Sequence, residues 1–289
     1  MSDGEDRYFD QLAQAYMAQW EEEERKRRLI LIKGKNMFNP NEIKTKAESK
    51  APLILLYSKH GVGKSSFIAS IPRVFAIDFE GKLNKFDQLV RYTPKTYGDF
   101  KEVLNWLLVQ EKPDFRAIAI DTADWLEMLI HKHVAESNNA KTVIDPNVKA
   151  TAFGNGYILA ANMFKNEILP LLEGIRDRFN IPVILTCHST IVPSKDPDAD
   201  AYDIHELKLH EKLRAIVSER MEAKIYAKLR QNVDQNGKPM PGKDRIFVCT
   251  PQKGIEAKNN LFLPDEFPVS YSNGWQDFIN QLNTTKPLN

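Results

Sequence analysis

Four short hydrophobic runs alternate with amphipathic stretches between residues 52 and 188. The runs are nearly continuous in apolar residues and cover 52–58 (PLILLYS), 73–79 (RVFAIDF), 116–122 (RAIAIDT) and 181–188 (IPVILTCH). Strands of a parallel sheet have this composition because helices cover the sheet on both faces. The pattern therefore predicts a mainly parallel central sheet.

The intervening stretches have helical periodicity. Helices are predicted over 64–71, 100–110, 125–135 and 157–179, and a charged helix is predicted over 204–221. Two further apolar runs, 223–230 and 245–251, flank the turn region QNGKPMPG and predict an antiparallel hairpin at the sheet edge. The fold class that follows is α/β.

A separate amphipathic helix is predicted from Tyr8 to about Arg28, followed by a linker at 33–51 that is rich in Lys, Asn and Pro. The domain organisation is then an N-terminal helix and linker over 1–50 and one α/β domain over 51–289. The apolar stripe of the helix must be buried somewhere, either on its own domain or on a neighbouring subunit. The pattern leaves both arrangements open.

Composition narrows the class of protein. The 289 residues are 42% hydrophobic and carry a net charge of +1, which suits a globular protein and does not by itself demand a polyanionic partner. Cys187 and Cys249 belong to no pair with metal spacing, which argues against a zinc site or a disulfide framework. No apolar run approaches the ~18 residues that span a bilayer, and the N-terminus is acidic. We therefore expect a cytoplasmic protein without a membrane partner.

The segment that follows the first apolar run has the spacing of a phosphate-binding loop. Residues 58–65 read SKHGVGKS and match G-x-x-x-x-G-K-[ST], except that Ser58 replaces the first glycine. Glycines let backbone N–H groups turn toward a β-phosphate, Lys64 reaches the β and γ oxygens, and Ser65 offers its hydroxyl to Mg²⁺. The predicted nucleotide-binding residues are Lys59, His60, Gly61, Val62, Gly63, Lys64, Ser65 and Ser66.

Polar residues at the ends of other strands supply the remaining chemistry. Asp121 is predicted to hold Mg²⁺, although it can equally cap the following helix. Glu80 is predicted to activate the attacking water, with a solvated loop carboxylate as the alternative and Asp78 as the next candidate. His188 ends the fourth run, where a polar group can sense the γ-phosphate or serve as an ordinary surface histidine.

Together these segments resemble the RecA superfamily of recombinase ATPases, and most closely the phage RecA-like single-strand annealing recombinases, also described as phage nucleotide-binding AAA-type proteins. IDFEGKLNK is similar to the strand that ends in the catalytic glutamate, here Glu80. KATAFGNGYILAANMFKNEILPLLEGI resembles the segment from the first DNA-binding loop into a long helix. IPVILTCHST is similar to the strand that ends in the γ-phosphate sensor, here His188, and the second DNA-binding loop follows it.

The resemblance also implies an ATP site between subunits. GIEAKNNLFLPDEF is similar to the lysine-asparagine element whose lysine reaches the neighbour's nucleotide, which places Lys258 in that role. Three departures predict slow hydrolysis: Ser58 replaces glycine, His188 replaces glutamine, and Asn260 stands at the place of a second lysine. The implied fold is a RecA-like P-loop NTPase core with an N-terminal helical extension.

The two implied loops, near 136–157 and 189–209, contain the candidate DNA contacts. Cations for phosphates and rings for base stacking are the combination expected in sequence-tolerant single-strand binding. The candidates are Lys141, Lys149, Phe153 and Tyr157 in the first loop and Lys195 in the second. The second loop is weaker, because acidic residues outnumber Lys195 and a solvated flap explains it equally well.

The function expected from these features is an ATP-dependent, single-stranded-DNA-binding recombination protein. It would use ATP and Mg²⁺, act by annealing or strand exchange, and assemble as a filament or ring. A single-stranded DNA-binding protein is a candidate further partner. The alternatives are a nucleotide-binding switch or accessory ATPase of replication or packaging, which Ser58 favours, and a small-molecule kinase, which lacks support because the sequence has no arginine-rich lid insertion.

Overall fold

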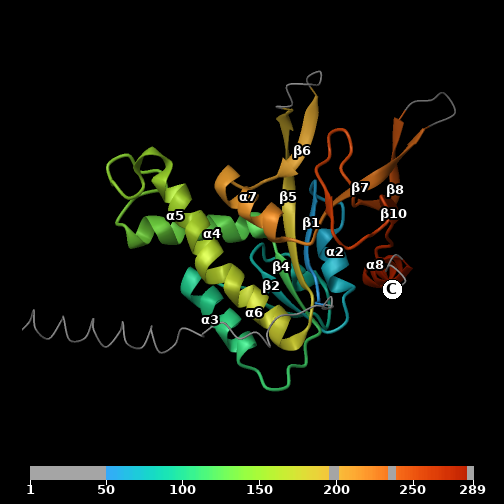
Figure 1. Cartoon of the computed structure of the whole chain (residues 1–289), viewed down its shortest axis with the longest axis horizontal. Helices are drawn as coiled ribbons and strands as arrows, with labels where there is room; N and C mark the ends of the chain where they lie inside the picture. The colour runs from blue at the N-terminus through green and yellow to red at the C-terminus, as the bar shows by residue number, and fades with distance from the viewer. Residues whose placement is uncertain (1–49, 195–201, 234–238, 285–289) are drawn as a thin grey trace, which may run out of the picture. The chain divides into compact units, whose positions relative to one another are not determined.

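The computed structural model describes residues 50–194, 202–233 and 239–284 (Figure 1). The predicted N-terminal helix and Lys195 lie outside these ranges. No helix within the described ranges is long and apolar enough to cross a membrane.

The described residues form a ten-stranded sheet system in the order β10-β8-β7-β1-β5-β4-β2-β3, with β6 paired to β5 and β9 to β7. The strands are β1 (Leu53–Ser58), β2 (Val74–Asp78), β3 (Val90–Tyr92), β4 (Ala117–Asp121), β5 (Val183–Pro193), β6 (Asp203–Leu207), β7 (Ala223–Val233), β8 (Pro239–Val248), β9 (Lys258–Asn259) and β10 (Glu266–Pro268). All pairs from β7 to β3 along this order are parallel, whereas β8 and β10 add antiparallel edge strands. The predicted α/β fold with a mainly parallel sheet and an antiparallel edge hairpin is confirmed.

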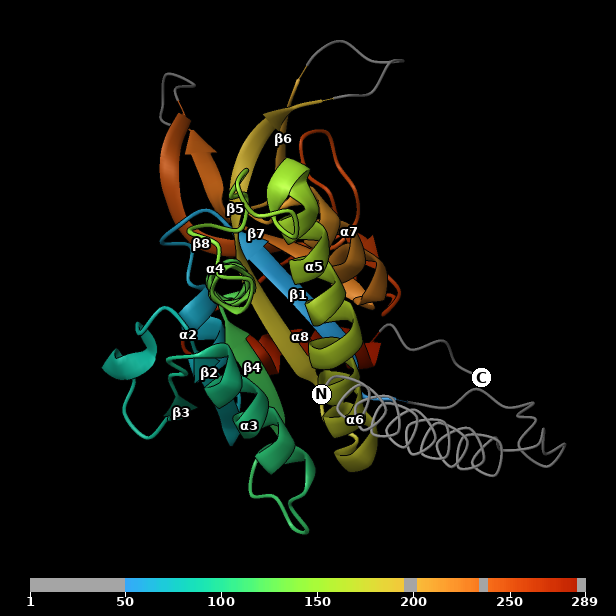
Figure 2. The same cartoon turned by 90° about the vertical axis from the view of Figure 1, so that its left-hand side faces the viewer.

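Helices cover both faces of the sheet (Figure 2). They are α2 (Lys64–Ala69), α3 (Tyr97–Leu108), α4 (Ala123–Ser137), α5 (Asn155–Met163), α6 (Leu169–Phe179), α7 (Glu211–Arg220) and α8 (Gly274–Thr284), with a π-helical turn at Phe164–Ile168 between α5 and α6. One apolar cluster joins one face of the sheet to α3, α4, α5, α6 and α7. The other joins the opposite face to α2 and α8.

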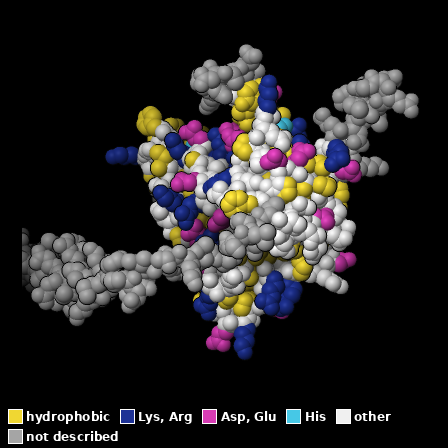
Figure 3. Space-filling model, turned by 45° about the vertical axis from the view of Figure 1, so that its right-hand side comes forward, with side chains coloured by type: hydrophobic (Ala, Val, Ile, Leu, Met, Phe, Trp, Pro, Cys, Tyr) yellow, Lys and Arg dark blue, Asp and Glu magenta, His cyan; other side chains and the backbone are white. Residues whose placement is uncertain are grey.

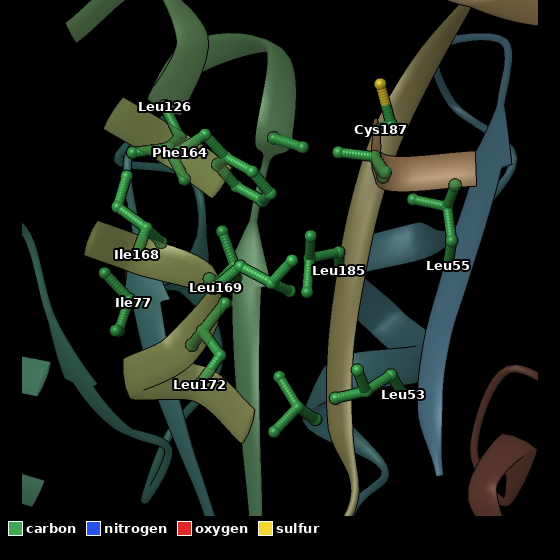
Figure 4. Packing of buried hydrophobic residues seen from close by; sticks show 14 of the residues in the cluster. Leu53, Leu55, Ile77, Leu126, Phe164, Ile168, Leu169, Leu172, Leu185 and Cys187 are labelled. Atoms are coloured by element: carbon green, nitrogen blue, oxygen red, sulfur yellow. The ribbon is translucent and has the colours of Figure 1, made fainter. Parts of the chain in front are cut away.

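Alternation along the strands divides the core between these two clusters. Leu53 and Leu55 of β1 face the larger cluster, whereas Ile54 between them faces the smaller one. Figure 4 shows Leu185 of β5 pointing toward Leu169, which follows the π-helical turn. Because both faces are buried, nearly continuous apolar runs are required in these strands.

One predicted element is wrong. Residues 204–221 do not form one helix, because Asp203–Leu207 is strand β6 and the helix begins only at Glu211. Residues 203–207 pair antiparallel with the extension of β5 beyond His188, from Ser189 opposite Leu207 to Pro193 opposite Asp203. Long-range pairing decides the structure of this charged segment. Strands β3, β9 and β10 and helix α8 were not predicted.

Candidate nucleotide-binding site

The strand register gathers the predicted polar residues at one edge of the sheet. Ser58 at the end of β1 lies opposite His188 of β5, and Asp78 at the end of β2 lies opposite Asp121 of β4. Because β5 lies between β1 and β4, the ends of β1, β4 and β2 lie side by side with His188 of β5. This is the edge where open α/β sheets bind ligands.

The phosphate-binding loop, Ser58–Ser65, runs from β1 into α2 with a left-handed backbone at Gly61 and Gly63. Gly63 has φ of 97°, and a Cβ there would lie 2.7 Å from the ring of Tyr271 and 2.9 Å from Arg245. Arg245 is buried and donates to the carbonyl oxygens of Gly63, Val269 and Ser270. Only glycine fits at position 63, and Arg245 fixes the turn by its hydrogen bond to the Gly63 carbonyl oxygen.

Lys64 is folded back onto the loop, with 6% of its surface exposed. Its Nζ lies 3.2 Å from Ser58 Oγ and 3.4 Å from the carbonyl oxygens of Ser58 and Lys59. Burial lowers the pKa of this ammonium group. Ser58 is the last residue of β1 and has extended backbone, so a side chain is tolerated where the motif has glycine. Because the present partners of Lys64 Nζ are neutral oxygens, an anion bound in the loop can replace them.

Asp121 connects the loop to the sheet. Its Oδ2 accepts from Ser65 Oγ at 2.9 Å, and its Oδ1 accepts from Thr186 Oγ1 at 2.5 Å. Burial raises the pKa of the Asp121 carboxyl more than these hydrogen bonds lower it. A hydroxyl beside a carboxylate is a donor set that Mg²⁺ accepts, so the residues present fit the ion that Ser65 and Asp121 were predicted to hold.

Glu80 and Asp78 have different surroundings. The Asp78 carboxylate accepts backbone N–H groups from Gly81, Lys82 and Leu83 at 2.7–3.2 Å and so shapes the turn after β2. The Glu80 side chain is only 6% exposed and pairs with Lys82. The Asp78 carboxylate is thus bonded to the backbone of the turn, whereas the Glu80 carboxylate is bonded to the exposed side chain of Lys82 and lines a cavity.

His188 is buried and oriented by Asp124, which sequence reasoning missed. Asp124 accepts His188 Nδ1 at 2.9 Å and the His188 backbone N–H at 3.1 Å. Burial opposes ionisation of Asp124, but hydrogen bonds, chiefly from His188, outweigh it and bring the pKa to about 2. The ring of His60 from the loop stacks on His188 with centroids 3.9 Å apart.

These side chains line a cavity of about 510 Å³. Its walls include His60, Glu80, Lys82, Asp124, Trp125, Glu127, Met128, His188, Lys208 and His210. Burial raises the pKa of Glu127 to about 7 and lowers the pKa of His131, one helical turn further along α4, to about 4. The predicted catalytic residues Glu80 and His188 thus share one cavity with Glu127, a carboxyl group with a raised pKa.

The first predicted DNA loop follows α4 and is held by Asp145. This carboxylate accepts the backbone N–H groups of Lys141 and Asn147 at 2.9 and 3.0 Å, and these hydrogen bonds lower its pKa. Lys141 and Lys149 are exposed. Phe153 has φ of 54° and is fully exposed, at 103% of its reference surface. The loop therefore presents two cations and one ring to solvent.

The other candidate contacts are placed differently. Tyr157, in α5, stacks on His210 at 3.8 Å and meets His131 edge-on, so one of its faces is already covered. Lys195 follows the hairpin strand β5, outside the described residues. Lys258 lies in β9, and its Nζ donates to the Glu219 carbonyl oxygen at the end of α7, 2.6 Å away. The structure thus brings Lys64, Ser65, Glu80, Asp121 and His188 together and leaves Lys258 apart from them within one protomer.

Three residues of the site were missed. Thr186 comes two residues before His188 on β5, and Asp124 comes three after Asp121 in the first turn of α4, so strand and helix periodicity could have placed both beside the predicted acids. Arg245 gave no such signal, because it reaches Gly63 from 182 residues away.

These features define a P-loop nucleotide-binding protein. They are a loop with two glycines at positive φ, a buried lysine, a serine bonded to an aspartate at the end of a strand, and a nearby glutamate. The chain belongs to the AAA domain family AAA_24, whose model matches residues 50–261. No curated protein matches. Among solved structures, the crystal structure of the RadB recombinase aligns at 15% identity and a TM-score of 0.42, covering 78% of this chain and 91% of that chain.

Proposed function

We propose that this AAA-type nucleotide-binding protein is an ATPase that binds single-stranded DNA and promotes recombination, by annealing or strand exchange, as an oligomer with ATP between subunits. The observation that carries the proposal is the convergence of Lys64, Ser65, Asp121 and Glu80 at one sheet edge. The resemblance to RecA-like annealing recombinases supplies the biological role.

Each residue has a defined task in hydrolysis. Lys64 moves from Ser58 Oγ to the β and γ phosphate oxygens of ATP, where its ammonium group pairs with negative charge. Mg²⁺, held through Ser65 and Asp121, would neutralise phosphate charge. Glu80 accepts a proton from the attacking water, for which it must leave Lys82. His188, oriented by Asp124, senses the γ-phosphate.

DNA binding is assigned to individual loop residues. On the face shown in Figure 3, Lys and Arg side chains are interspersed with Asp and Glu, so this face offers no continuous basic surface. Lys141 and Lys149 supply local cations, and the fully exposed ring of Phe153 supplies a platform for a base. An exposed phenylalanine at positive φ costs free energy in the free protein and is consistent with a binding role.

The deciding experiment measures ATP hydrolysis by the full chain with and without single-stranded DNA. We expect turnover to rise when DNA is added. Hydrolysis that ignores DNA would point to an accessory ATPase, and binding without turnover would point to a nucleotide switch. The switch is the second candidate, because Ser58 Oγ and Lys82 hold Lys64 and Glu80 in the nucleotide-free protein.

Assembly is tested through Lys258. If Lys258 acts on a neighbour's nucleotide, Lys258→Ala keeps ATP binding but loses hydrolysis and ATP-dependent assembly on DNA. Mixing Lys258→Ala with Lys64→Ala chains then restores some turnover, because one partner has an intact loop and the other supplies the lysine. If the lysine only caps α7, Lys258→Ala stays active and loses about 0.3–1 kcal/mol of stability.

A further inference from the structure

The cavity beside the phosphate-binding loop contains three side chains with the donor atoms of a transition-metal site. His60 and His188 each offer a ring nitrogen and Glu80 a carboxylate oxygen, and the three atoms lie within 4.8 Å of one another. They come from the loop, from β5 and from the end of β2, which explains why no spacing in the sequence reveals them. Two imidazoles with one carboxylate suit zinc better than magnesium, which prefers oxygen ligands.

The surroundings of His188 strengthen this assignment. Its Nδ1 is bonded to Asp124 Oδ2 at 2.9 Å, and the residue lines the cavity, so the other ring nitrogen is the one left for a metal ion. A carboxylate behind a histidine is the arrangement that orients metal-bound imidazoles and raises their basicity. The same pair explains why a histidine is buried at this place.

Closure around an ion requires His60 to leave its stacked position on His188, where the ring centroids are 3.9 Å apart. Tetrahedral zinc with bonds of about 2.0–2.2 Å keeps neighbouring ligand atoms roughly 3.5 Å apart. His60 is exposed on the loop and can turn to meet this spacing. Glu80 must release Lys82, whose side chain is 59% exposed and can move into solvent.

We propose that His60, Glu80 and His188 form a zinc-binding site, separate from the Ser65–Asp121 pair, in the nucleotide-free protein. Zinc there takes the Glu80 carboxylate away from the attacking water and inhibits hydrolysis. The inhibition rests on the proposed ATPase function, whereas the binding site does not.

The site is tested on the nucleotide-free full chain, stripped of metal and titrated with Zn²⁺ against a chromophoric chelator. We expect one tight site per chain. His60→Ala changes an exposed side chain and should weaken zinc binding by about 10–100-fold. Asp124→Asn, which alters the hydrogen-bond partner of His188, should weaken it by a similar factor. Lys82→Ala should tighten it, because zinc no longer competes with an ammonium group. Ser65→Ala and His133→Ala serve as controls and should bind as the wild type does.

Wild-type zinc affinity in His60→Ala would overturn the site, as would equal losses in the His133→Ala control. Hydrolysis is then measured with Mg²⁺ and added Zn²⁺: wild type should be inhibited at zinc concentrations that leave any residual His60→Ala turnover unchanged. A protein that binds zinc but never hydrolyses ATP would refute the ATPase proposal and leave the metal site standing.

Discussion

Two buried aspartates organise the nucleotide pocket and the first loop, and they are bonded differently. Asp121 accepts from the side-chain hydroxyls of Ser65 and Thr186, whereas Asp145 accepts from the backbone N–H groups of Lys141 and Asn147. The pKa of Asp121 is raised, chiefly by burial, and that of Asp145 is lowered, chiefly by the Lys141 N–H. Hydroxyls can rotate to admit a cation, but backbone donors cannot.

The difference shows where each region keeps its functional groups. In the pocket, Lys64 and Glu80 are buried and paired inside the chain, so a ligand must take them from Ser58 and Lys82. In the first loop, Asp145 holds the backbone in place, and Lys149 and Phe153 are already exposed to solvent, so they need no rearrangement to contact a ligand. Substitutions in the pocket should therefore change ATP chemistry, and those on the loop should change DNA binding alone.

The largest expected effect is on turnover. Glu80→Gln keeps the shape of the side chain but removes the base, so we expect hydrolysis to fall by about 10²–10⁴-fold while ATP affinity is kept. Single-turnover hydrolysis and calorimetry measure the two quantities separately. Wild-type turnover in this variant would mean that another group activates the water.

Lys64→Ala should weaken ATP·Mg²⁺ binding by about 2–5 kcal/mol, because the phosphate oxygens lose the buried cation that neutralises them. Calorimetry on the full chain measures this loss. Lys85→Ala, a lysine in the short helical turn after β2, is the charge-matched control and should bind normally. Equal affinity in Lys64→Ala and wild type would contradict the phosphate-loop assignment.

The pocket could be predicted from the sequence because each of its main residues follows an apolar strand. Parallel strands bring their carboxyl ends to one edge, so Ser58, Asp121 and His188 had to meet. Arg245 acts through a contact with Gly63, 182 residues away in the sequence, that no local pattern encodes. The segment 203–207 was misassigned because its pairing with Ser189–Pro193 of β5 is a long-range contact that its own residues do not reveal.

Phe153→Ala tests whether the loop acts apart from the pocket. Loss of one stacking platform should cost about 1–3 kcal/mol of single-stranded DNA affinity and leave ATP binding without DNA unchanged. Tyr92→Ala, an exposed aromatic on the far edge strand β3, is the matched control. Fluorescence anisotropy with a labelled oligonucleotide measures both. Equal DNA affinity in Phe153→Ala and wild type would remove the ring from the binding surface.

The smallest expected effect is on the pH dependence of stability and concerns Glu127, which contacts both regions. Glu127 lines the cavity together with Glu80. Both of its carboxylate oxygens accept the backbone N–H of His210, and the His210 ring stacks on Tyr157. Its pKa rises on folding from 4.5 to about 7, so the folded state binds more protons than the unfolded state between these values, and stability falls as pH rises. His131 does the opposite, because its pKa drops from 6.5 to about 4 on folding.

Over the shared range, about pH 4.5–6.5, the two slopes oppose each other, and each is at most about 1.4 kcal/mol per pH unit. We expect urea unfolding of the wild type to change little with pH there. Glu127→Gln should leave only the histidine, so that stability rises with pH, and His131→Phe should leave only the carboxyl, so that stability falls. Parallel pH profiles in the two variants would mean that Glu127 and His131 do not titrate as a balanced pair, and that pH does not act on the link between the pocket and α5.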